Sequence, residues 1–256
     1  MVSDLGNSFY KYFQIVPATN PYLLEQVYKL RYEVLCLEKK FSSFIAADYP
    51  DRLEKDVYDE RSSHYLVHHL ESDRYIGTVR LIFGGGVDGL HTFPMIKYAH
   101  DAIDVSDFRK VATHQVAEIS RLIIKKEFRS RIRSFKFTGG TYEDYKQITR
   151  ANRLVTHPVI GLLAAILKMS SDNDIRYWIA GMEPSLNKRL SQLGLQLKPI
   201  GPYVQYHGLR RPYMGVVDDV VNSLFCNNRE IWGFVTEQGK LWPPPDMGCI
   251  QPQQAG

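Results

Sequence analysis

The sequence predicts a mixed α+β fold, in which helices cover both faces of one central sheet. Three observations lead to this prediction. Strand-like and helix-like segments alternate along most of the 256 residues, two neighbouring strand-like runs are separated by a turn, and one long apolar helix lies in the second half. A chain of this length can bury one full core, so we expect one domain with an appended tail.

The N-terminal part begins with a strand over residues 11–17 and a helix that starts at Asn20. Asn20 is a typical helix N-cap, and Pro21 suits the first helical position. Apolar residues then recur at helical spacing, which predicts that one side of this helix packs against a core. They are Leu23, Leu24, Val27, Leu30, Val34 and Leu35. Residues 41–59 are irregular, and a long loop in a compact domain is often functional.

The following elements complete the sheet and its helices. Two strand-like runs, 64–70 and 75–83, are separated by a short polar turn and predict a hairpin. The elements expected after it are a short helix near 96–102, a strand at 116–124, a long helix over about 150–170, a strand at 174–181, a short helix from Glu183 to Leu193 ended by Gly194, and closing strands at 195–207 and 212–217. We divide the chain into one domain, 1–222, and a C-terminal extension, 223–256, whose last residues are expected to be disordered.

The composition argues against several classes of function. A net charge of +4 is too small to indicate a nucleic-acid-binding protein. The first residues do not form a signal peptide, and the longest apolar run, 159–167, is too short to span a bilayer, so we expect a cytoplasmic protein without a transmembrane segment. Three widely spaced cysteines predict neither a disulfide framework nor a metal site. His68 and His69 point to opposite faces of a strand, so no metal is expected there either.

The strand at 116–124 carries polar residues that a buried strand usually lacks. With a side-chain period of two, Glu118 and Ser120 lie on one face of the strand and Arg121 lies on the other. A carboxylate and a hydroxyl are costly to bury unless they are paired. The strand therefore lines a polar cleft or carries a hydrogen-bonded buried network, and a plain solvated face is the third interpretation.

Five short polar features follow one another in a characteristic order. They are Arg31-x2-Val34, Phe41, Glu54-x-Asp56-x2-Asp59, Gly77-x2-Arg80-Leu81 and Glu118-x-Ser120-Arg121. Together they resemble the acyl-homoserine-lactone (autoinducer) synthases and the related N-acyl amino acid synthases, which have the GCN5-related N-acetyltransferase (GNAT) fold. The second half, with Asn187-x5-Gln192-Leu-Gly194, is similar to acetyltransferases in general. The tail from Glu230 to Trp242 resembles that of acyltransferases associated with PEP-CTERM/exosortase systems.

The resemblance implies a GNAT fold, an α/β/α sandwich with a mixed, mostly antiparallel sheet, and the activity of an acyltransferase (EC 2.3.1 type). The leading hypothesis is transfer of a long-chain fatty acyl group from an acyl carrier protein thioester to the amine of an amino acid or a related small amine. One alternative is an acyl-homoserine-lactone synthase that uses S-adenosylmethionine, although such enzymes commonly have tryptophan in place of Phe41. Another is a non-catalytic acyl-binding or regulatory module on the same fold. Acyl length, acceptor and oligomeric state stay open.

The resemblance also implies roles for the polar residues. Glu118 is the expected base, acting directly or through one water, unless it is a structural carboxylate paired with Arg31 or Arg80. Ser120 hydrogen-bonds the acceptor or only satisfies the strand, and Arg121 or Arg80 is a candidate for holding an acceptor carboxylate. An ion-pair network that shapes the amine pocket is expected from Arg31, Asp56, Asp59, Arg80 and Arg121. Phe41 flanks the acyl tunnel or belongs to the core.

Two further features would assist the transfer. A backbone amide of the Glu118 strand, displaced by a bulge as in acetyltransferases, would polarise the thioester carbonyl. Tyr203 and Tyr206 are expected to be core residues, with protonation of the leaving thiolate as their alternative role.

The donor is expected to be acyl carrier protein rather than coenzyme A, with no other cofactor. Acetyltransferases bind the coenzyme A pyrophosphate on a glycine-containing loop after this strand, whereas residues 128–133 contain no glycine. Without glycine the backbone cannot approach a pyrophosphate closely. Acyl carrier proteins are acidic, and a run of basic residues here would suit docking of such a partner. The run contains Lys125, Lys126, Arg129, Arg131, Arg133 and Lys136.

Overall fold

The computed structural model describes residues 4–39, 41, 43–85, 89–99, 111–129, 158–192 and 194–245. These residues form an eight-stranded sheet in the order β1-β2-β3-β4-β5-β8-β6, and β7 pairs with β8. The strands are β1 (Phe13–Pro17), β2 (Ser62–His69), β3 (Arg74–Phe83), β4 (Val116–Ile124), β5 (Tyr177–Met182), β6 (Lys198–Pro199), β7 (Val204–Gln205) and β8 (Leu209–Val216). Only the β4–β5 pair is parallel among them. The predicted mixed, mostly antiparallel sheet is confirmed.

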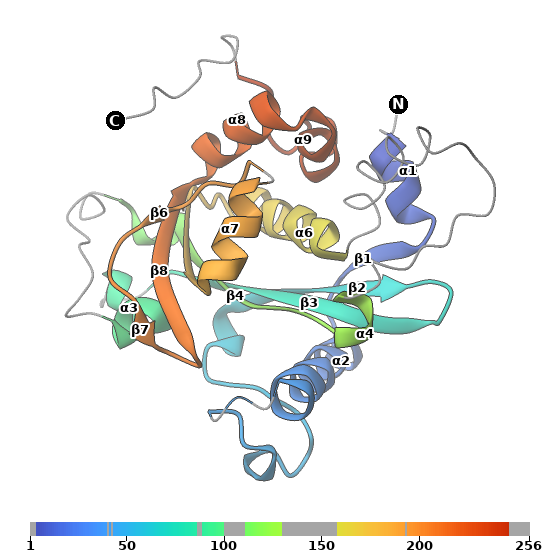
Figure 1. Cartoon of the computed structure of the whole chain (residues 1–256), viewed down its shortest axis with the longest axis vertical. Helices are drawn as coiled ribbons and strands as arrows, with labels where there is room; N and C mark the ends of the chain where they lie inside the picture. Colours follow the sequence, from blue (N-terminus) through green and yellow to red (C-terminus); the bar gives the residue numbers. More distant parts are fainter. Residues whose placement is uncertain are drawn as a thin grey trace.

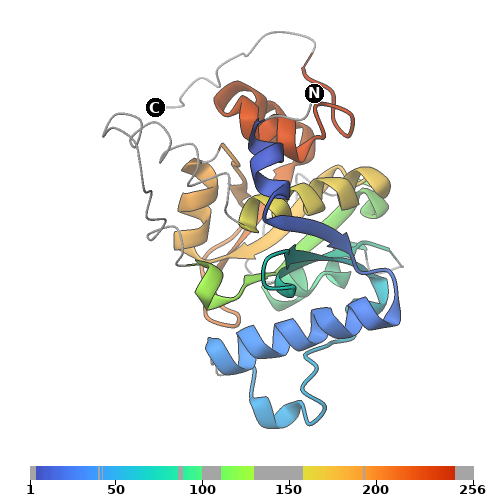
Figure 2. The ribbon, with the colours of Figure 1, turned by 90° about the vertical axis from the view of Figure 1, so that its right-hand side faces the viewer.

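Helices cover both faces of this sheet, as the sequence predicts. Figures 1 and 2 show α2 (Pro21–Tyr32) below the sheet, continued by the π-helical turn η1 (Glu33–Glu38). The opposite face is covered by α6 (Pro158–Asp172), α8 (Val217–Asn227), α9 (Arg229–Val235) and α1 (Asp4–Tyr10). The shorter helices are α3 (Pro94–Tyr98), α4 (Lys126–Arg129) and α7 (Pro184–Gln192), together with the 3-10 turns η2 (Ala46–Asp48), η3 (Asp59–Arg61), η4 (Gly89–Thr92) and η7 (Thr113–Gln115). None of the helices in the described ranges has the length and apolar character that crossing a membrane requires.

Local sequence signals account for the first elements. The Asn20 side chain accepts a hydrogen bond from the Leu23 backbone N–H at 2.9 Å, so it caps α2 as expected. The strands β2 and β3 pair as the predicted antiparallel hairpin. Alternate residues of these strands reach different layers: Val79 packs on the side of α6, and Leu66 packs on the side of α2.

The C-terminal helices belong to the main core. Leu224, Ile231 and Val235 are buried in the same apolar cluster as the inner face of α6. The domain limit expected after residue 222 therefore falls inside α8. Cys226 in α8 takes part in a disulfide bond, whereas Cys36 is buried and free.

Two predicted elements lie partly outside the described residues. The long helix is described from Pro158 onward, and its expected beginning near residue 150 is not among the described positions. The short helix expected at 96–102 is observed as Pro94–Tyr98. Residues 251–256 also lie outside the described ranges.

Candidate active site

Strand β4 contains a bulge at Arg121 that shapes the site. Arg80 pairs with Ser120 and Thr78 pairs with Ile123, so β4 uses one more residue than β3 over this stretch. Arg121 has φ of 51°, in the left-handed region that most side chains avoid. The bulge turns Arg121 toward Asp56, which also binds Arg80. The expectation that Arg121 lies on the other face is therefore wrong, because a strict period of two does not hold across a bulge.

The strands β4 and β5 separate at the same place. Their parallel pairing extends only as far as Ile119 and Ala180, and in the described register the segment Ser120–Leu122 has no partner on β5. Arg121 and Leu122 have no Cα partner on β3 in the described register either. This part of the β4 backbone borders a cavity instead of a neighbouring strand. The bulge on this strand was expected from the resemblance, and it is present.

Glu118 lies buried at the edge of this cavity, 3% exposed. Its carboxylate accepts a hydrogen bond from the backbone N–H of Met95, in the first turn of α3, at 2.8 Å. Burial raises the pKa of Glu118 to about 7, although the Met95 N–H and the nearby charge of Arg80 act in the opposite direction. Among the described residues Glu118 forms no ion pair with Arg31 or Arg80, so the structural pairing considered for it is not observed.

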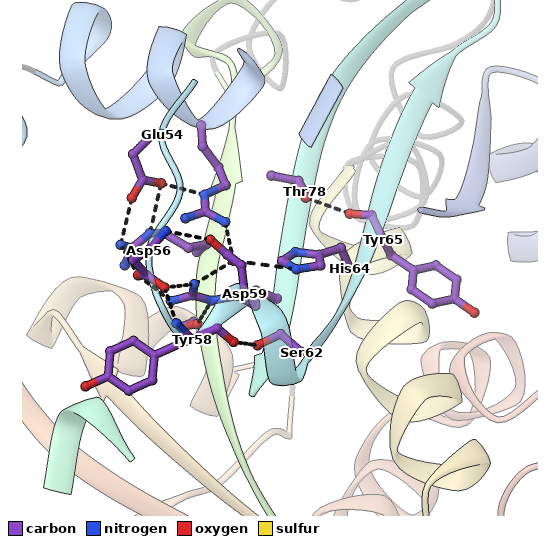
Figure 3. Close-up of polar contacts among 12 residues, drawn as sticks. Glu54, Asp56, Tyr58, Asp59, Ser62, His64, Tyr65 and Thr78 are labelled. Atoms are coloured by element: carbon purple, nitrogen blue, oxygen red, sulfur yellow. Dashed lines mark hydrogen bonds and ion pairs between the residues drawn. The ribbon is translucent and has the colours of Figure 1, made fainter. Parts of the chain in front are cut away.

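Three arginines and three carboxylates form one buried network beside Glu118. Figure 3 shows Glu54, Asp56 and Asp59 on the segment that precedes β2, with His64 of β2 facing Asp59. The contacts are Arg31 Nε to Glu54 and Arg31 Nη1 to Asp59 at 2.7 Å, Arg80 Nη1 to Asp56 at 2.6 Å and to Asp59 at 2.7 Å, and Arg121 Nη2 to Glu54 at 2.9 Å and to Asp56 at 3.0 Å. The ion pairs expected among these residues are present, and Glu54 joins them.

The network keeps its carboxylates charged despite their burial. Burial alone raises the pKa of Glu54, but the guanidinium groups of Arg121 and Arg31 outweigh it and hold this pKa at about 2. The pKa of Asp59 is lowered in the same way, chiefly by Arg31. Burial lowers the pKa of the Arg121 guanidinium, yet Glu54 and Asp56 raise it above its ordinary value. Glu54, Asp59 and Arg121 are therefore ionised at neutral pH.

Ser120 belongs to this network and not to a free surface. Its Oγ accepts a hydrogen bond from Arg80 Nε at 2.9 Å. The other Arg80 donors point at Asp56 and Asp59. Because its donors are used in this way, Arg80 is poorly placed to grip an acceptor carboxylate in the present arrangement. Arg121 likewise directs Nε and Nη2 to Glu54 and Asp56.

A cavity of about 320 Å³ connects Glu118 with the apolar interior. Ser120, Arg121, Tyr206 and His207 line its polar end beside Glu118. The rest of the wall is mainly apolar and comes from β4, β5, α6, α7, α8 and α9. Its apolar residues include Leu122, Ile124, Leu163, Ile166, Leu167, Trp178, Met182, Leu186, Leu190, Leu224 and Val235. Such a cavity, small but within the range of ligand pockets (~300–1,000 Å³), suits an apolar chain that carries a polar reacting group at one end.

Tyr206 and His207 are site residues whose importance sequence reasoning underestimated. Burial and the neighbouring Glu118 charge raise the pKa of Tyr206 to about 12, so its phenol keeps its proton. Burial and Arg121 lower the pKa of His207 to about 4, so its ring is neutral. Tyr203, expected in the core beside Tyr206, is instead 46% exposed and does not line the cavity. The β7–β8 turn at His207 and Gly208 brings Tyr206 into the site.

Phe41 lines the cavity, as one of its two expected roles requires.

Two of the basic residues in the predicted docking run already form ion pairs with carboxylates of this chain. Lys125 pairs with Glu33 of η1, and Arg129 pairs with Glu38 at 3.1 Å and lines the cavity. Lys126 is exposed on α4. Arg131, Arg133 and Lys136 lie outside the described residues.

Comparison with known proteins identifies the fold. Residues 30–135 match the family model described as "Acetyltransferase (GNAT) domain". None of the curated proteins matches this sequence. Among solved structures, the CoA-dependent acyl-homoserine lactone synthase BjaI with SAM and isopentyl-CoA is 18% identical, with 91% of this chain and 90% of that chain covered and a TM-score of 0.56.

Two other structures give the same result. TofI in a ternary complex with an inhibitor and MTA is 14% identical, with 84% of this chain and 96% of that chain covered and a TM-score of 0.56. The CoA-dependent acyl-homoserine lactone synthase MesI is 17% identical, with 88% and 93% covered and a TM-score of 0.53. At these identities the likeness is one of fold. The chain has the GNAT fold, and its domain match supports an acyltransferase enzyme of the GNAT type.

Proposed function

We propose that this protein is an N-acyltransferase that moves a fatty acyl group from a thioester donor to the amine of an amino acid or a related small amine. The observation that carries the proposal is the cavity, in which an apolar tunnel leads to a buried carboxylate whose pKa is near neutrality. The tunnel suits an acyl chain, and the carboxylate suits a base for the amine.

The proposed reaction uses the residues at the polar end of the cavity. The amine nitrogen attacks the thioester carbonyl, and Glu118 removes a proton from the nitrogen, directly or through one water. The β4 backbone at the Arg121 bulge is available to polarise the carbonyl oxygen. Collapse of the tetrahedral intermediate forms the amide and breaks the C–S bond. Tyr206, which keeps its phenolic proton, supplies it to the departing thiolate.

We propose acyl carrier protein as the donor's carrier, docked on the basic residues around Lys126 and Arg129. The absence of glycine from residues 128–133 supports this choice, since a pyrophosphate-binding backbone loop needs glycine. Acyl-coenzyme A is the second candidate, because BjaI and MesI are CoA-dependent acyl-homoserine lactone synthases. Because its tail resembles that of exosortase-associated acyltransferases, we also propose that the protein works together with an exosortase system.

A lactone synthase is the second candidate function. BjaI was solved with SAM and isopentyl-CoA, so S-adenosylmethionine belongs among the acceptors to be tested. The third candidate is a non-catalytic acyl-binding module. Its cavity would bind acyl chains without turnover.

The test is thiol release from acyl carrier protein thioesters and acyl-coenzyme A, with pooled amino acids, amines and S-adenosylmethionine as acceptors. Products are identified by mass spectrometry, and Glu118→Gln serves as the control because it keeps the size of the side chain. We expect an N-acyl amino acid that is absent with the variant. A lactone product would replace the proposal by the second candidate, and binding without turnover would favour the third. If the thioester donors are hydrolysed at a rate that no acceptor changes, the proposed transferase activity is contradicted.

A further inference from the structure

Lys39 lies on the wall of the cavity and has no acidic partner among the described residues. It follows the π-helical turn η1 at the end of α2, and its ammonium lies over the Phe41 ring at 5.2 Å from the centroid. Its side chain is partly buried, and among the described residues it forms no ion pair with a carboxylate. A partly buried ammonium without a counter-ion is costly, so the position favours an anionic ligand.

Arg210, in the first part of β8, approaches the same ring. Its guanidinium carbon lies 5.7 Å from the Phe41 centroid, and the group pairs with Glu183 and donates to the His207 carbonyl at 3.2 Å. Lys39 and Arg210 therefore converge on one aromatic side chain that also lines the cavity.

The charges around Lys39 leave an excess of positive charge on this wall. Arg129 lines the cavity nearby and pairs with Glu38. The pKa of Lys39 is lowered, first by burial and then by the charges of Arg129 and Arg210. Three cations are thus matched by two carboxylates, Glu38 and Glu183. An anion in this place would relieve the repulsion between the cations.

The position of this cluster in the cavity suggests which anion it binds. The far end of the cavity is apolar and closed by buried residues such as Leu224 and Val235. The wall around Lys39, Arg129 and Glu183 is partly exposed to solvent, so it forms the opening. An acyl chain that occupies the apolar end would place the thioester near Glu118 and direct the rest of the donor toward this opening.

We propose that Lys39 and Arg210 form a side-chain subsite for the phosphate of the donor's 4′-phosphopantetheine arm. This inference rests on the proposed acyl transfer. The phosphate is common to acyl-coenzyme A and to acyl carrier protein, so the subsite serves either carrier. It takes the place of a glycine-rich backbone cradle, which residues 128–133 cannot supply. Lys39 gives an ammonium without a carboxylate partner among the described residues, and Arg210 adds a second positive charge, although its Nη1 and Nη2 already bind Glu183 and the His207 carbonyl.

The test compares donors that differ only in the phosphate: acyl-pantetheine and acyl-phosphopantetheine with the same acyl group. We expect kcat/KM of the wild type to be about 10- to 100-fold higher with the phosphorylated donor, the range of one or two hydrogen bonds to a charged group. In Lys39→Met and Arg210→Met this preference should fall toward 1. Lys168→Met on α6, an exposed lysine paired with Asp172, should keep the wild-type preference.

Several outcomes would overturn the subsite. A wild type without a preference for the phosphate would do so, as would variants that lose activity with both donors equally. If the variants raise KM only for acceptors that carry a carboxylate, and not for the corresponding decarboxylated amines, the cluster binds the acceptor instead. Parallel arms with acyl-coenzyme A and acyl carrier protein thioesters show which carrier presents the phosphate best.

A binding measurement separates failure of the subsite from failure of the proposed function. Phosphopantetheine and pantetheine are titrated into the wild type and into Lys39→Met by calorimetry, which requires no turnover. Tighter binding of the phosphorylated compound to the wild type alone supports the subsite even if no acyl transfer is found. Equal binding of the two compounds contradicts it, whatever the enzyme assay gives.

Discussion

The Glu118 carboxylate accepts a hydrogen bond from the Met95 backbone N–H at 2.8 Å, while the neighbouring arginines are neutralised by other carboxylates. This division of partners matters for the proposed chemistry. A direct ion pair with Arg80 would lower the pKa of Glu118 and make it a weak base at neutral pH. Glu54, Asp56 and Asp59 take up the arginine charges instead. Glu118 is left in a desolvated position that raises its pKa to about 7.

The pH dependence of acyl transfer should report this pKa. Since only the carboxylate form of Glu118 can accept the proton, kcat/KM should rise with pH, reach half its maximum near pH 7 and level off above it. Glu118→Gln should lower kcat/KM by about 10²- to 10⁴-fold and abolish its rise with pH near 7. The acceptor should be a weakly basic amine, which is already neutral near pH 7, so that the pH dependence reports the ionisation of the enzyme and not that of the acceptor. If kcat/KM of the Glu118→Gln variant still rises near pH 7, another group is the base.

Removal of Arg31 should destabilise the protein strongly. Arg31 is 0% exposed and binds both Glu54 and Asp59, so Arg31→Met leaves two buried carboxylates short of a partner. Loss of one partner from a buried pair costs about 3–5 kcal/mol. Arg74→Met is the control, because Arg74 pairs with Glu127 on the surface and should cost at most about 1 kcal/mol. The free energies of unfolding come from urea titration, and equal losses in the two variants would contradict a stabilising network.

The same network should make the protein sensitive to acid. The pKa of Glu54 falls from 4.5 to about 2 on folding, so its contribution is fully present above about pH 4.5 and is lost as the pH falls toward 2. A shift of this size corresponds to about 3 kcal/mol. Glu118 acts oppositely, because its raised pKa gives stability at low pH that is lost between about pH 4.5 and 7.

The measurement is therefore made in the Glu118→Gln background, with and without Glu54→Gln. The free energy of unfolding is compared at pH 6 and pH 3. The background with Glu54 intact should be more stable at pH 6 and should lose more stability on acidification than the double variant. Parallel pH dependence in the two proteins would show that Glu54 has no lowered pKa.

Sequence reasoning predicted the features that depend on local patterns. Asn20 could be identified as an N-cap because its neighbours along the chain determine the capping geometry. The strand at 116–124 and the hairpin before it follow from apolar alternation over short stretches. The order of these elements then led to a mixed sheet with helices on both faces.

The parts that were wrong or missing depend on contacts between distant segments. Alternation placed Arg121 opposite Glu118, and only the register against β3 reveals the bulge that reverses this. Glu54 was recognised as part of a motif but not as the bidentate partner of Arg121, which lies 67 residues away in the chain. Lys125 belongs to the basic run expected to dock an acidic partner, yet Glu33 pairs with it from η1. Such pairings are set by packing and leave no periodic trace in the sequence.

The C-terminal helices should set the acyl length that the enzyme accepts. Leu224 of α8 and Val235 of α9 close the apolar end of the cavity, although both follow the last strand of the sheet. Val235→Phe fills part of this end, so kcat/KM should shift toward shorter acyl groups across a series of thioester donors. The cost in stability should be about 1–3 kcal/mol, as for other overpacked positions.

Val221→Phe is the matched control for this prediction. Val221 is as buried as Val235, 0% exposed, but it does not line the cavity. The control should lose similar stability and keep the wild-type preference for acyl length, because its added ring lies outside the cavity. If both variants shift the preference equally, the effect comes from general distortion of α8 and α9. If neither shifts it, the acyl chain does not reach the end of the cavity that Val235 closes.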